Sequence, residues 1–404
     1  MFHAGYERSP LPPARPDEAA RPVPPAPEAA PAAARGGGGQ AKQRDPYFDN
    51  AKFLAIVLVV IGHAWAPMTG DSRIMQALYG FVYVFHMPAF VLISGYFSRS
   101  FDMRPKQLKR LVTTVVVPYV VFEAAYTVFK RTGDAPEHAL SLLDPWFLTW
   151  FLVALFVWRL TTPLWKAVRW PVPLSVAIAV MASLSPQTGG DLSMQRVLQF
   201  LPFFVLGLRL RPEHFLLVRR RAVRLVAAPV AVASLAVTYW ATTRMDFGWL
   251  YHQKSVQGFG VPWWIGAPMN LALLCCSLVL TVCFLAWVPG RRTWFTALGV
   301  GTLYAYLLHG FFAQWARMHD WYDRLEWIYT PAGAIAVTAA AAVLGTVLCT
   351  APVQRVFRPV VEPRVDWIFK PDASPAGSGR GGPSPADGRG GPDSGAKAGA
   401  AASG

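Results

Sequence analysis

Long apolar segments separated by short polar and basic connections make up most of the chain. They lie at about residues 50–67, 75–97, 110–129, 146–160, 172–185, 196–210, 222–243, 263–288, 294–313 and 329–356. A membrane-spanning helix needs roughly 20 apolar residues, and apolar runs without period-two alternation indicate helices rather than a membrane barrel. The pattern therefore predicts an all-α fold, a polytopic membrane bundle of about ten transmembrane helices.

The two ends of the chain have a different composition. Residues 1–45 are dominated by Pro, Ala, Gly and Arg without the apolar core of a secretory signal, and residues 371–404 are mostly Gly, Ser, Pro, Ala and Asp. Neither segment can bury enough apolar surface to order itself. We expect a disordered cytoplasmic leader at 1–45, a transmembrane domain at 46–370 and a disordered cytoplasmic tail at 371–404.

Composition supports a lipid environment. Hydrophobic residues make up 53% of the chain and charged residues only 15%, which leaves too little polar surface for a water-soluble protein of this kind. The net charge of +15 is explained by the preference of Lys and Arg for cytoplasmic loops, and no nucleic-acid-binding motif accompanies it. The cysteines lie within apolar segments, where packing is their expected role. The oligomeric state stays open.

The basic residues of the connections alternate between rich and poor loops. The rich loops outweigh the poor ones, among which Arg196 is counted, by about two to one, and cytoplasmic loops are the ones enriched in Lys and Arg. This bias predicts that both termini are cytoplasmic. Together with the Ala, Arg, Pro and Gly-rich composition, it predicts a multi-pass protein of a bacterial plasma membrane.

The first apolar segment carries three ionisable residues on one helix face. Lys52 and His63 are eleven residues apart, which returns to within about 20° of the same face and separates them by roughly 16 Å along the axis. Asp49 is placed to pair with Lys52. A neutral imidazole in a low-dielectric site can accept a proton, which suits a general base. The alternative of two interfacial charges and a structural histidine stays open here.

Other ionisable residues fall inside apolar segments, where a charge costs about 2.5–3.5 kcal/mol on insertion scales. His86 precedes Pro88, which we expect to kink its helix and to free the Val84 carbonyl. His309 lies in another segment, and either histidine could be a hydrogen-bonded core residue or a substrate contact. For Glu123 the alternatives are a neutral, a paired or an acid-base group, and the sequence does not choose among them.

Several stretches together resemble the acyltransferase-3 family of membrane acyltransferases, most closely its fucose 4-O-acetylase-like branch. They are Asp49-Asn50-Ala51-Lys52 through Gly62-His63, Phe85-His86-Met87-Pro88 with Ser94-Gly95-Tyr96, Leu108-Lys109-Arg110 to Pro118-Tyr119, Trp150-Phe151-Leu152 with Ala154-Leu155, Pro202-Phe203-Phe204 with Gly207, and Leu303-Tyr304 through Leu308-His309. They occur in the family's order over about residues 45–360.

The resemblance implies a ten-helix domain that moves an acyl group, usually acetyl from acetyl-CoA, to a hydroxyl group. Acceptors in the family are sugars, polysaccharides, peptidoglycan, lipids or secondary metabolites, and the histidine matching His63 is regarded as essential. This chain has Lys52 where the broader family has Arg, so a bidentate contact is replaced by a point charge. It also lacks a clean Arg-x-x-Arg pair after the second segment.

These observations lead to a specific hypothesis for an O-acyltransferase. His63 is the general base, and Lys52, held by Asp49, positions the coenzyme or favours negative charge at the thioester oxygen. We expect the coenzyme phosphates to meet Arg104, Lys106, Lys109 and Arg110. We expect His86, Ser94 and His309 to line the acceptor path. We expect no metal and no permanently bound cofactor, acetyl-CoA being a co-substrate.

Two hypotheses compete with the enzyme. A proton-coupled carrier would use the buried His and Glu residues as a proton relay, although no internal repeat is evident in the sequence. A scaffold of an envelope-synthesis complex would leave the shared face of Asp49, Lys52 and His63 unexplained. The sequence identifies neither the acceptor nor the membrane face at which it is modified.

Overall fold

Every regular element in the described part of the chain, residues 44–70, 72–133, 135–188, 190–363 and 366–369, is helical. This computed structural model thus confirms the predicted all-α fold. The predicted tail and all but the end of the predicted leader lie outside the described residues. The α-helices are α1 Pro46–Trp65, α2 Arg73–Phe97, α3 Pro105–Leu111, α4 Val117–Arg131, α5 Trp150–Leu160, α6 Thr162–Ala167, α7 Pro171–Ser183, α8 Met194–Gln199, α9 Leu201–Arg209, α10 Pro212–Val218, α11 Arg221–Ala241, α12 Trp263–Trp287, α13 Thr302–Met318, α14 Trp321–Arg324, α15 Pro331–Leu348 and α16 Ala351–Val361.

Six helical segments in the described residues are long and apolar enough to cross a membrane. They are Pro46–Thr69, Arg73–Phe97, Pro105–Arg131, Arg221–Ala241, Trp263–Trp287 and Pro331–Leu348. On α11, Leu225, Val226 and Val232 are all exposed, as expected of a helix that faces lipid. The chain is therefore a multi-pass membrane protein, and the count of ten spans stays a prediction.

Two predicted segments are divided by proline. The segment predicted at 196–210 consists of α8 and α9, which meet at Phe200 just before Pro202. In the segment predicted at 329–356, α15 ends at Leu348, and Pro352 lies in the first turn of a separate helix, α16. Proline has no backbone N–H and restricts the residue before it, so it starts a helix more readily than it continues one.

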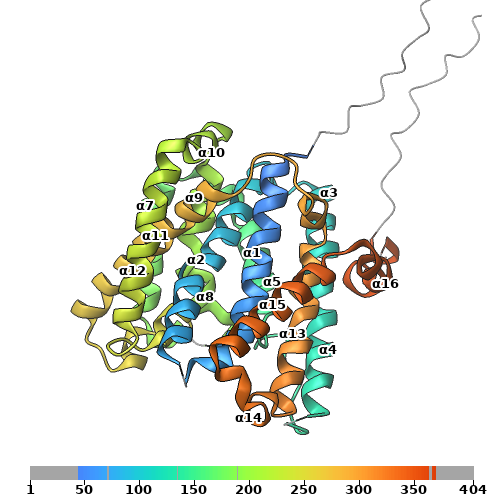
Figure 1. Ribbon diagram of the computed structural model, residues 1–404. Coiled ribbons are helices and arrows are strands. Elements are labelled where there is room, and N and C mark those ends of the chain that lie inside the picture. The colour runs from blue at the N-terminus through green and yellow to red at the C-terminus, as the bar shows by residue number, and fades with distance from the viewer. Residues whose placement is uncertain (1–43, 71, 134, 189, 364–365, 370–404) are drawn as a thin grey trace, which may run out of the picture. The chain divides into compact units, whose positions relative to one another are not determined.

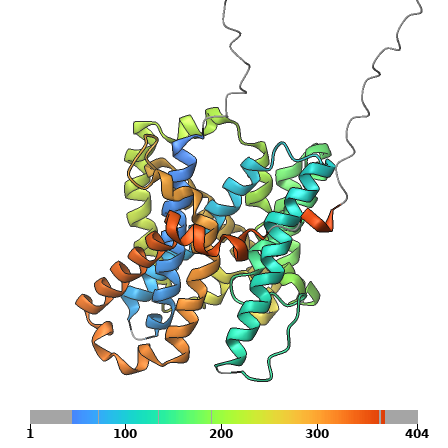
Figure 2. The ribbon, with the colours of Figure 1, turned by 90° about the vertical axis from the view of Figure 1, so that its right-hand side faces the viewer.

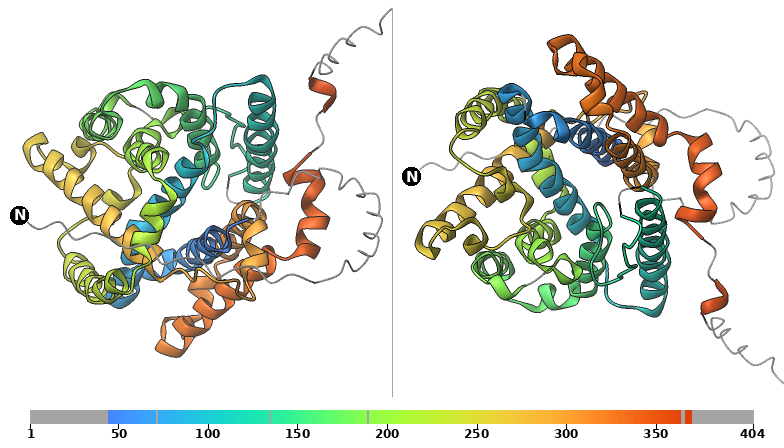
Figure 3. Two further views of the ribbon diagram at one scale, coloured as in Figure 1. Left: turned by 90° about the horizontal axis from the view of Figure 1, so that it is seen from above. Right: turned by 90° about the horizontal axis from the view of Figure 1, so that it is seen from below.

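Helix α1 packs against α2, α13 and α15. Figure 3 views many of the helices end-on and shows α1 in blue among these neighbours. In Figure 1, α3 and α10 lie at the end of the bundle where α1 begins, and α14 lies at the opposite end. Side chains at the start and the end of α1 thus belong to two separate regions of the bundle.

The backbones of α2 and α9 approach each other at two glycines. A Cβ atom on Gly207 would overlap the Leu92 carbonyl oxygen, and one on Gly95 would overlap the Phe204 carbonyl oxygen. Small residues allow such contacts between membrane helices, where van der Waals packing replaces the hydrophobic effect. The contact fixes the part of α2 that follows His86.

A buried polar network joins α8, α12 and the segment between α11 and α12. The Nδ1–H of His252 and the amide of Asn270 both donate to Gln199 Oε1, at 2.8 Å and 2.9 Å. Gln199 in turn donates to Gln195 at 2.9 Å. Each of these four side chains is more than nine-tenths buried. Burial lowers the pKa of His252 from 6.5 to about 4, and the charge of Arg196 acts in the same direction.

Replacement of Gly207 by alanine tests the α2–α9 contact. We expect Gly207→Ala to lower the free energy of unfolding by about 1–3 kcal/mol, because the added methyl group forces two backbones apart. The matched control is Gly70→Ala, since a Cβ at Gly70 meets no atom within 4 Å. Thermal unfolding of the purified protein in detergent measures both; equal midpoints for the two variants would contradict the close approach.

The network also predicts a pH dependence of stability. Between about pH 6.5 and pH 4 the unfolded chain protonates His252 whereas the folded chain does not, so stability declines as the pH falls through this window. Below about pH 4, the free energy of unfolding is lower by about 3 kcal/mol than above about pH 6.5 because of this one group. We expect His252→Gln to reduce the drop in unfolding midpoint between about pH 7.5 and pH 5, with the exposed His319→Gln as control. If the unfolding midpoint of His252→Gln falls as much as that of the wild type, His252 is not the source of the pH dependence.

Candidate active site

The predicted ion pair lies at the beginning of α1. Lys52 Nζ is 2.7 Å from Asp49 Oδ1, which confirms the pairing, and Asp49 is only 7% exposed. The helix continues without a break to Trp65, so Lys52 and His63 keep their spacing of roughly 16 Å along one face. At that distance Lys52 is placed to act on a different part of a ligand from His63.

Asn50 secures this end of α1, a function that the sequence did not reveal. Its side-chain amide donates to the carbonyl oxygens of Pro289 and Arg291, at 2.8 Å and 3.0 Å. Its Oδ1 accepts from the hydroxyl groups of Thr296, at 2.7 Å, and Thr293, at 3.2 Å. All the hydrogen-bonding capacity of a fully buried amide is thus used to hold the loop after α12 against the Asp49–Lys52 pair.

The other end of α1 brings His63 to His309 of α13. Their ring centroids are 5.3 Å apart. The Phe147 ring contacts the His63 ring edge to face, with the two centroids 4.9 Å apart. His63 is half-buried and makes no hydrogen bond within the described residues. Both nitrogens of its ring are therefore available to a ligand.

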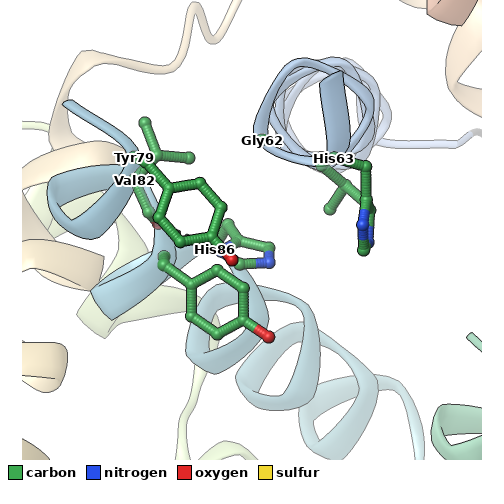
Figure 4. Close-up of a pocket in the computed structure, with 7 residues that line it drawn as sticks. Gly62, His63, Tyr79, Val82 and His86 are labelled. Atoms are coloured by element: carbon green, nitrogen blue, oxygen red, sulfur yellow. Dashed lines mark hydrogen bonds between the residues drawn. The ribbon is translucent and has the colours of Figure 1, made fainter. Parts of the chain in front are cut away.

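His86 faces the same region from α2. It lines a pocket with Gly62 and His63 of α1 and with Tyr79 and Val82 of α2, as Figure 4 shows. A Cβ on Gly62 would meet no atom within 4 Å, in line with a glycine that leaves room beside His63. The free volume is about 10 Å³, enough for about one water molecule. A larger acceptor therefore requires α1 and α2, or the tyrosine side chains, to separate.

Backbone carbonyl groups fix the tautomers of two histidines. His309 Nδ1 donates to the Ala305 carbonyl at 2.8 Å, and His86 Nδ1 donates to the Val82 carbonyl at 3.0 Å. With the proton on Nδ1, the neutral ring presents Nε2 as an acceptor. The Nε2 atom of His309 is buried and has no hydrogen-bond partner among the described residues, so it can accept from a ligand hydroxyl.

Glu123 supports the site from α4 by holding the segment before α5, which Figure 2 shows as a loop beside α4. Its carboxylate accepts from the Trp146 N–H at 3.1 Å and from the Thr149 hydroxyl at 2.5 Å. Between these two residues, Phe147 has a φ of 53°, which explains why α5 begins at Trp150 and not at the predicted 146. Glu123 thus positions the Phe147 ring against His63.

The predicted coenzyme-binding residues lie around α3. Arg104, Lys106 and Arg110 are exposed, and Lys109 lies 5.2 Å from the ring centroid of Phe369. Nearby, Lys166 is committed to Asp102 at 2.6 Å, and this hydrogen bond holds the pKa of that carboxyl below its usual value. Helix α3 lies at the end of the bundle where α1 begins (Figure 1), and Lys52 lies in the second turn of α1.

Ser94 lies apart from the three histidines. It follows His86 by two helical turns, about 12 Å, and does not line the pocket. Within the described residues no group of three His, Cys, Asp or Glu side chains is arranged to hold a metal ion. The role of Ser94 on the acceptor path stays a prediction.

Arg196 is the functional candidate that the sequence misplaced. Its charge was counted among the connecting loops, but it lies in α8, is only 9% exposed and stacks 4.8 Å from the ring centroid of Trp150. The signal was its position as the first residue of the apolar segment predicted at 196–210.

Comparison with known proteins gives the following matches. A family model described as an acyltransferase domain matches residues 45–350. Nodulation protein NolL of Sinorhizobium fredii is 27% identical over 187 residues, 41% of this chain and 49% of that protein. Nodulation protein NolL of Mesorhizobium japonicum is 26% identical over 181 residues, 41% and 47% respectively. The alignments thus span about half the length of these relatives. No solved structure gives a significant match.

The role of Glu123 can be tested by Glu123→Gln. The amide keeps one acceptor oxygen but places a donor opposite the Trp146 N–H or the Thr149 hydroxyl, so we expect a loss of about 1.5–3 kcal/mol of stability. The exposed Glu137→Gln, in the same connecting segment, is the matched control. Unfolding midpoints measure the effect; an unchanged midpoint together with abolished activity would instead identify Glu123 as an acid-base group.

Proposed function

The chain belongs to the acyltransferase family whose domain model spans residues 45–350, and on this premise we propose that it is an O-acyltransferase. The donor is an acyl-CoA, with acetyl-CoA as the first choice. The acceptor is a hydroxyl group of a carbohydrate, cell-envelope or lipid-linked molecule. The proposed location is the plasma membrane of a bacterium, with both termini in the cytoplasm. Family membership favours this reading over the carrier, which no separate observation supports.

The observation that carries the proposal is the convergence of His63, His86 and His309 from three helices. The His63 and His309 rings are 5.3 Å apart, and the pocket joins His63 to His86. In the part of the chain that the structure describes, His309 Nε2 has no hydrogen-bond donor, although the residue is only 1% exposed. A buried polar atom without a partner costs about 1–3 kcal/mol. A ligand hydroxyl that donates to this atom would remove the cost.

The proposed reaction needs one base and no covalent enzyme intermediate. The reacting hydroxyl of the acceptor binds at His63, while a second hydroxyl of the ligand donates to His309 Nε2. His63 removes the proton of the first hydroxyl as its oxygen attacks the thioester carbonyl. An O–C bond forms, the C–S bond breaks, and the coenzyme leaves as a thiolate. The proton on His63 then passes to this sulfur, which restores the neutral imidazole and completes a balanced transfer.

The donor is proposed to approach from the Lys52 end of α1. Exposed cations at Arg104, Lys106 and Arg110 suit the phosphates of coenzyme A. Lys52 lies between this region and His63, and it is neutralised in part by Asp49. Because roughly 16 Å separates Lys52 from His63, we retain coenzyme positioning for Lys52 and assign no oxyanion contact to it.

Replacement of His63 is the first test. We expect His63→Ala to reduce transfer from radiolabelled acetyl-CoA, measured with purified protein in lipid and membrane-derived acceptors, by about 10²- to 10⁴-fold. Lys52→Ala should raise the KM for acetyl-CoA. The control is His319→Ala, because His319 is an exposed histidine that does not line the pocket.

The outcomes separate the alternatives. Label that reaches an acceptor or water in wild type and His319→Ala, but not in His63→Ala, supports the enzyme with His63 as its base. Equal transfer by all variants would remove His63 from the mechanism. Flux of a substrate across the lipid without acetyl-CoA, retained in His63→Ala, would support a carrier.

A further inference from the structure

Arg196 is a buried cation for which the described residues provide no acid. It is 9% exposed, and none of the ion pairs of the described residues includes it. Its one hydrogen bond within that part of the chain runs from Nε to the Tyr251 carbonyl, at 3.2 Å. Trp150 covers the guanidinium plane at 4.8 Å. The two terminal nitrogens of the guanidinium fork make no hydrogen bond to the described residues and are available to a ligand.

The surroundings of Arg196 connect it to the His63 pocket. Tyr251, whose carbonyl accepts from Arg196, packs its ring 4.8 Å from that of Tyr83 and hydrogen-bonds through its hydroxyl to Tyr79 at 3.1 Å. Tyr79 and Tyr83 both line the pocket, and Figure 4 shows Tyr79 on the α2 side of it. Arg196 is thus linked through Tyr251 to the tyrosines of the pocket, and a larger acceptor reaches it when those tyrosine side chains separate.

A structural role alone accounts poorly for this arrangement. Burying a charge costs several kcal/mol even after relaxation, and cation–π stacking returns about 2 kcal/mol when desolvated. A methionine or leucine would fill the same space beside Trp150 without the cost. Buried charges in proteins are normally paired, and an arginine inside a membrane bundle usually marks a substrate path.

We propose that Arg196 binds an anionic group, a carboxylate or a phosphate, of the acceptor whose hydroxyl is acylated at His63. This inference rests on the proposed function and adds the charge of the substrate to it. The guanidinium fork matches either anion with two parallel hydrogen bonds. The phosphates of the coenzyme are not its ligand, because their proposed site is at the Lys52 end of α1, roughly 16 Å along the helix from His63.

The test measures binding without acetyl-CoA, so that it gives an answer even if acyl transfer fails. Thermal unfolding of the purified full chain is followed with glucuronate, glucose 1-phosphate and glucose at matched ionic strength. Variants are Arg196→Gln, which removes the charge, and Arg196→Lys, which keeps the charge without the fork. The control is Arg244→Gln, because Arg244 is exposed and bonds only within its own helix end in the described residues.

We expect one or both anionic sugars, but not glucose, to raise the unfolding midpoint of the wild type and of Arg244→Gln. Arg196→Gln should weaken the apparent Kd by about tenfold or more, and Arg196→Lys by less. Stabilisation by glucuronate alone identifies a carboxylate, and by glucose 1-phosphate alone a phosphate. Equal stabilisation by glucose, an unchanged Kd in Arg196→Gln, or no stabilisation by either anion would overturn the proposal.

Arg196→Gln must remain folded for this comparison, and its midpoint without sugar shows whether it does. If the midpoint of Arg196→Gln is too low for a binding measurement, the comparison is made between the wild type and Arg196→Lys. A lysine with the same affinity as the wild type for both anions would exclude recognition by the fork. Failure of wild-type acetyl transfer in the earlier experiment would contradict the proposed function and leave these binding results to stand separately.

Discussion

Polar groups inside an apolar helical bundle have to find their partners within the chain, because lipid offers none. The described helices meet this constraint at Asn50, Gln199 and Glu123, where each buried side chain bonds to a different element. The same constraint makes the exceptions informative. Within the described residues, His309 Nε2 has no donor and the two terminal nitrogens of Arg196 have no acceptor. His309 contacts His63 directly, and Arg196 is linked to the pocket through Tyr251.

Much of the fold follows from local sequence. Each predicted apolar segment coincides with one or two helices, because an apolar run in lipid must satisfy its own backbone hydrogen bonds. The Asp49–Lys52 pair was predictable, since a spacing of three residues is fixed by helix geometry alone. The family resemblance was also confirmed, because motifs in order along the chain do not depend on knowing how the helices pack.

The parts that the sequence could not predict depend on contacts between distant segments. No local pattern brings His309 to His63, or Glu123 to the loop that carries Phe147. The left-handed backbone of Phe147 is set by that loop rather than by its own preference. Arg196 was misplaced for a related reason: a charge at the edge of an apolar run can face a loop or the bundle interior, and only packing distinguishes the two.

The unbroken course of α1 has a consequence for which donors the enzyme can use. On the proposed function, charge recognition lies at one end of the helix and the base lies three turns away, so a donor must carry its acyl group on an arm that covers this distance. Coenzyme A and an acyl carrier protein share such a phosphopantetheine arm, whereas a compact donor such as acetyl phosphate cannot contact both ends at once. On the proposed function, α1 therefore selects donors by length before any contact with the acyl group itself is made.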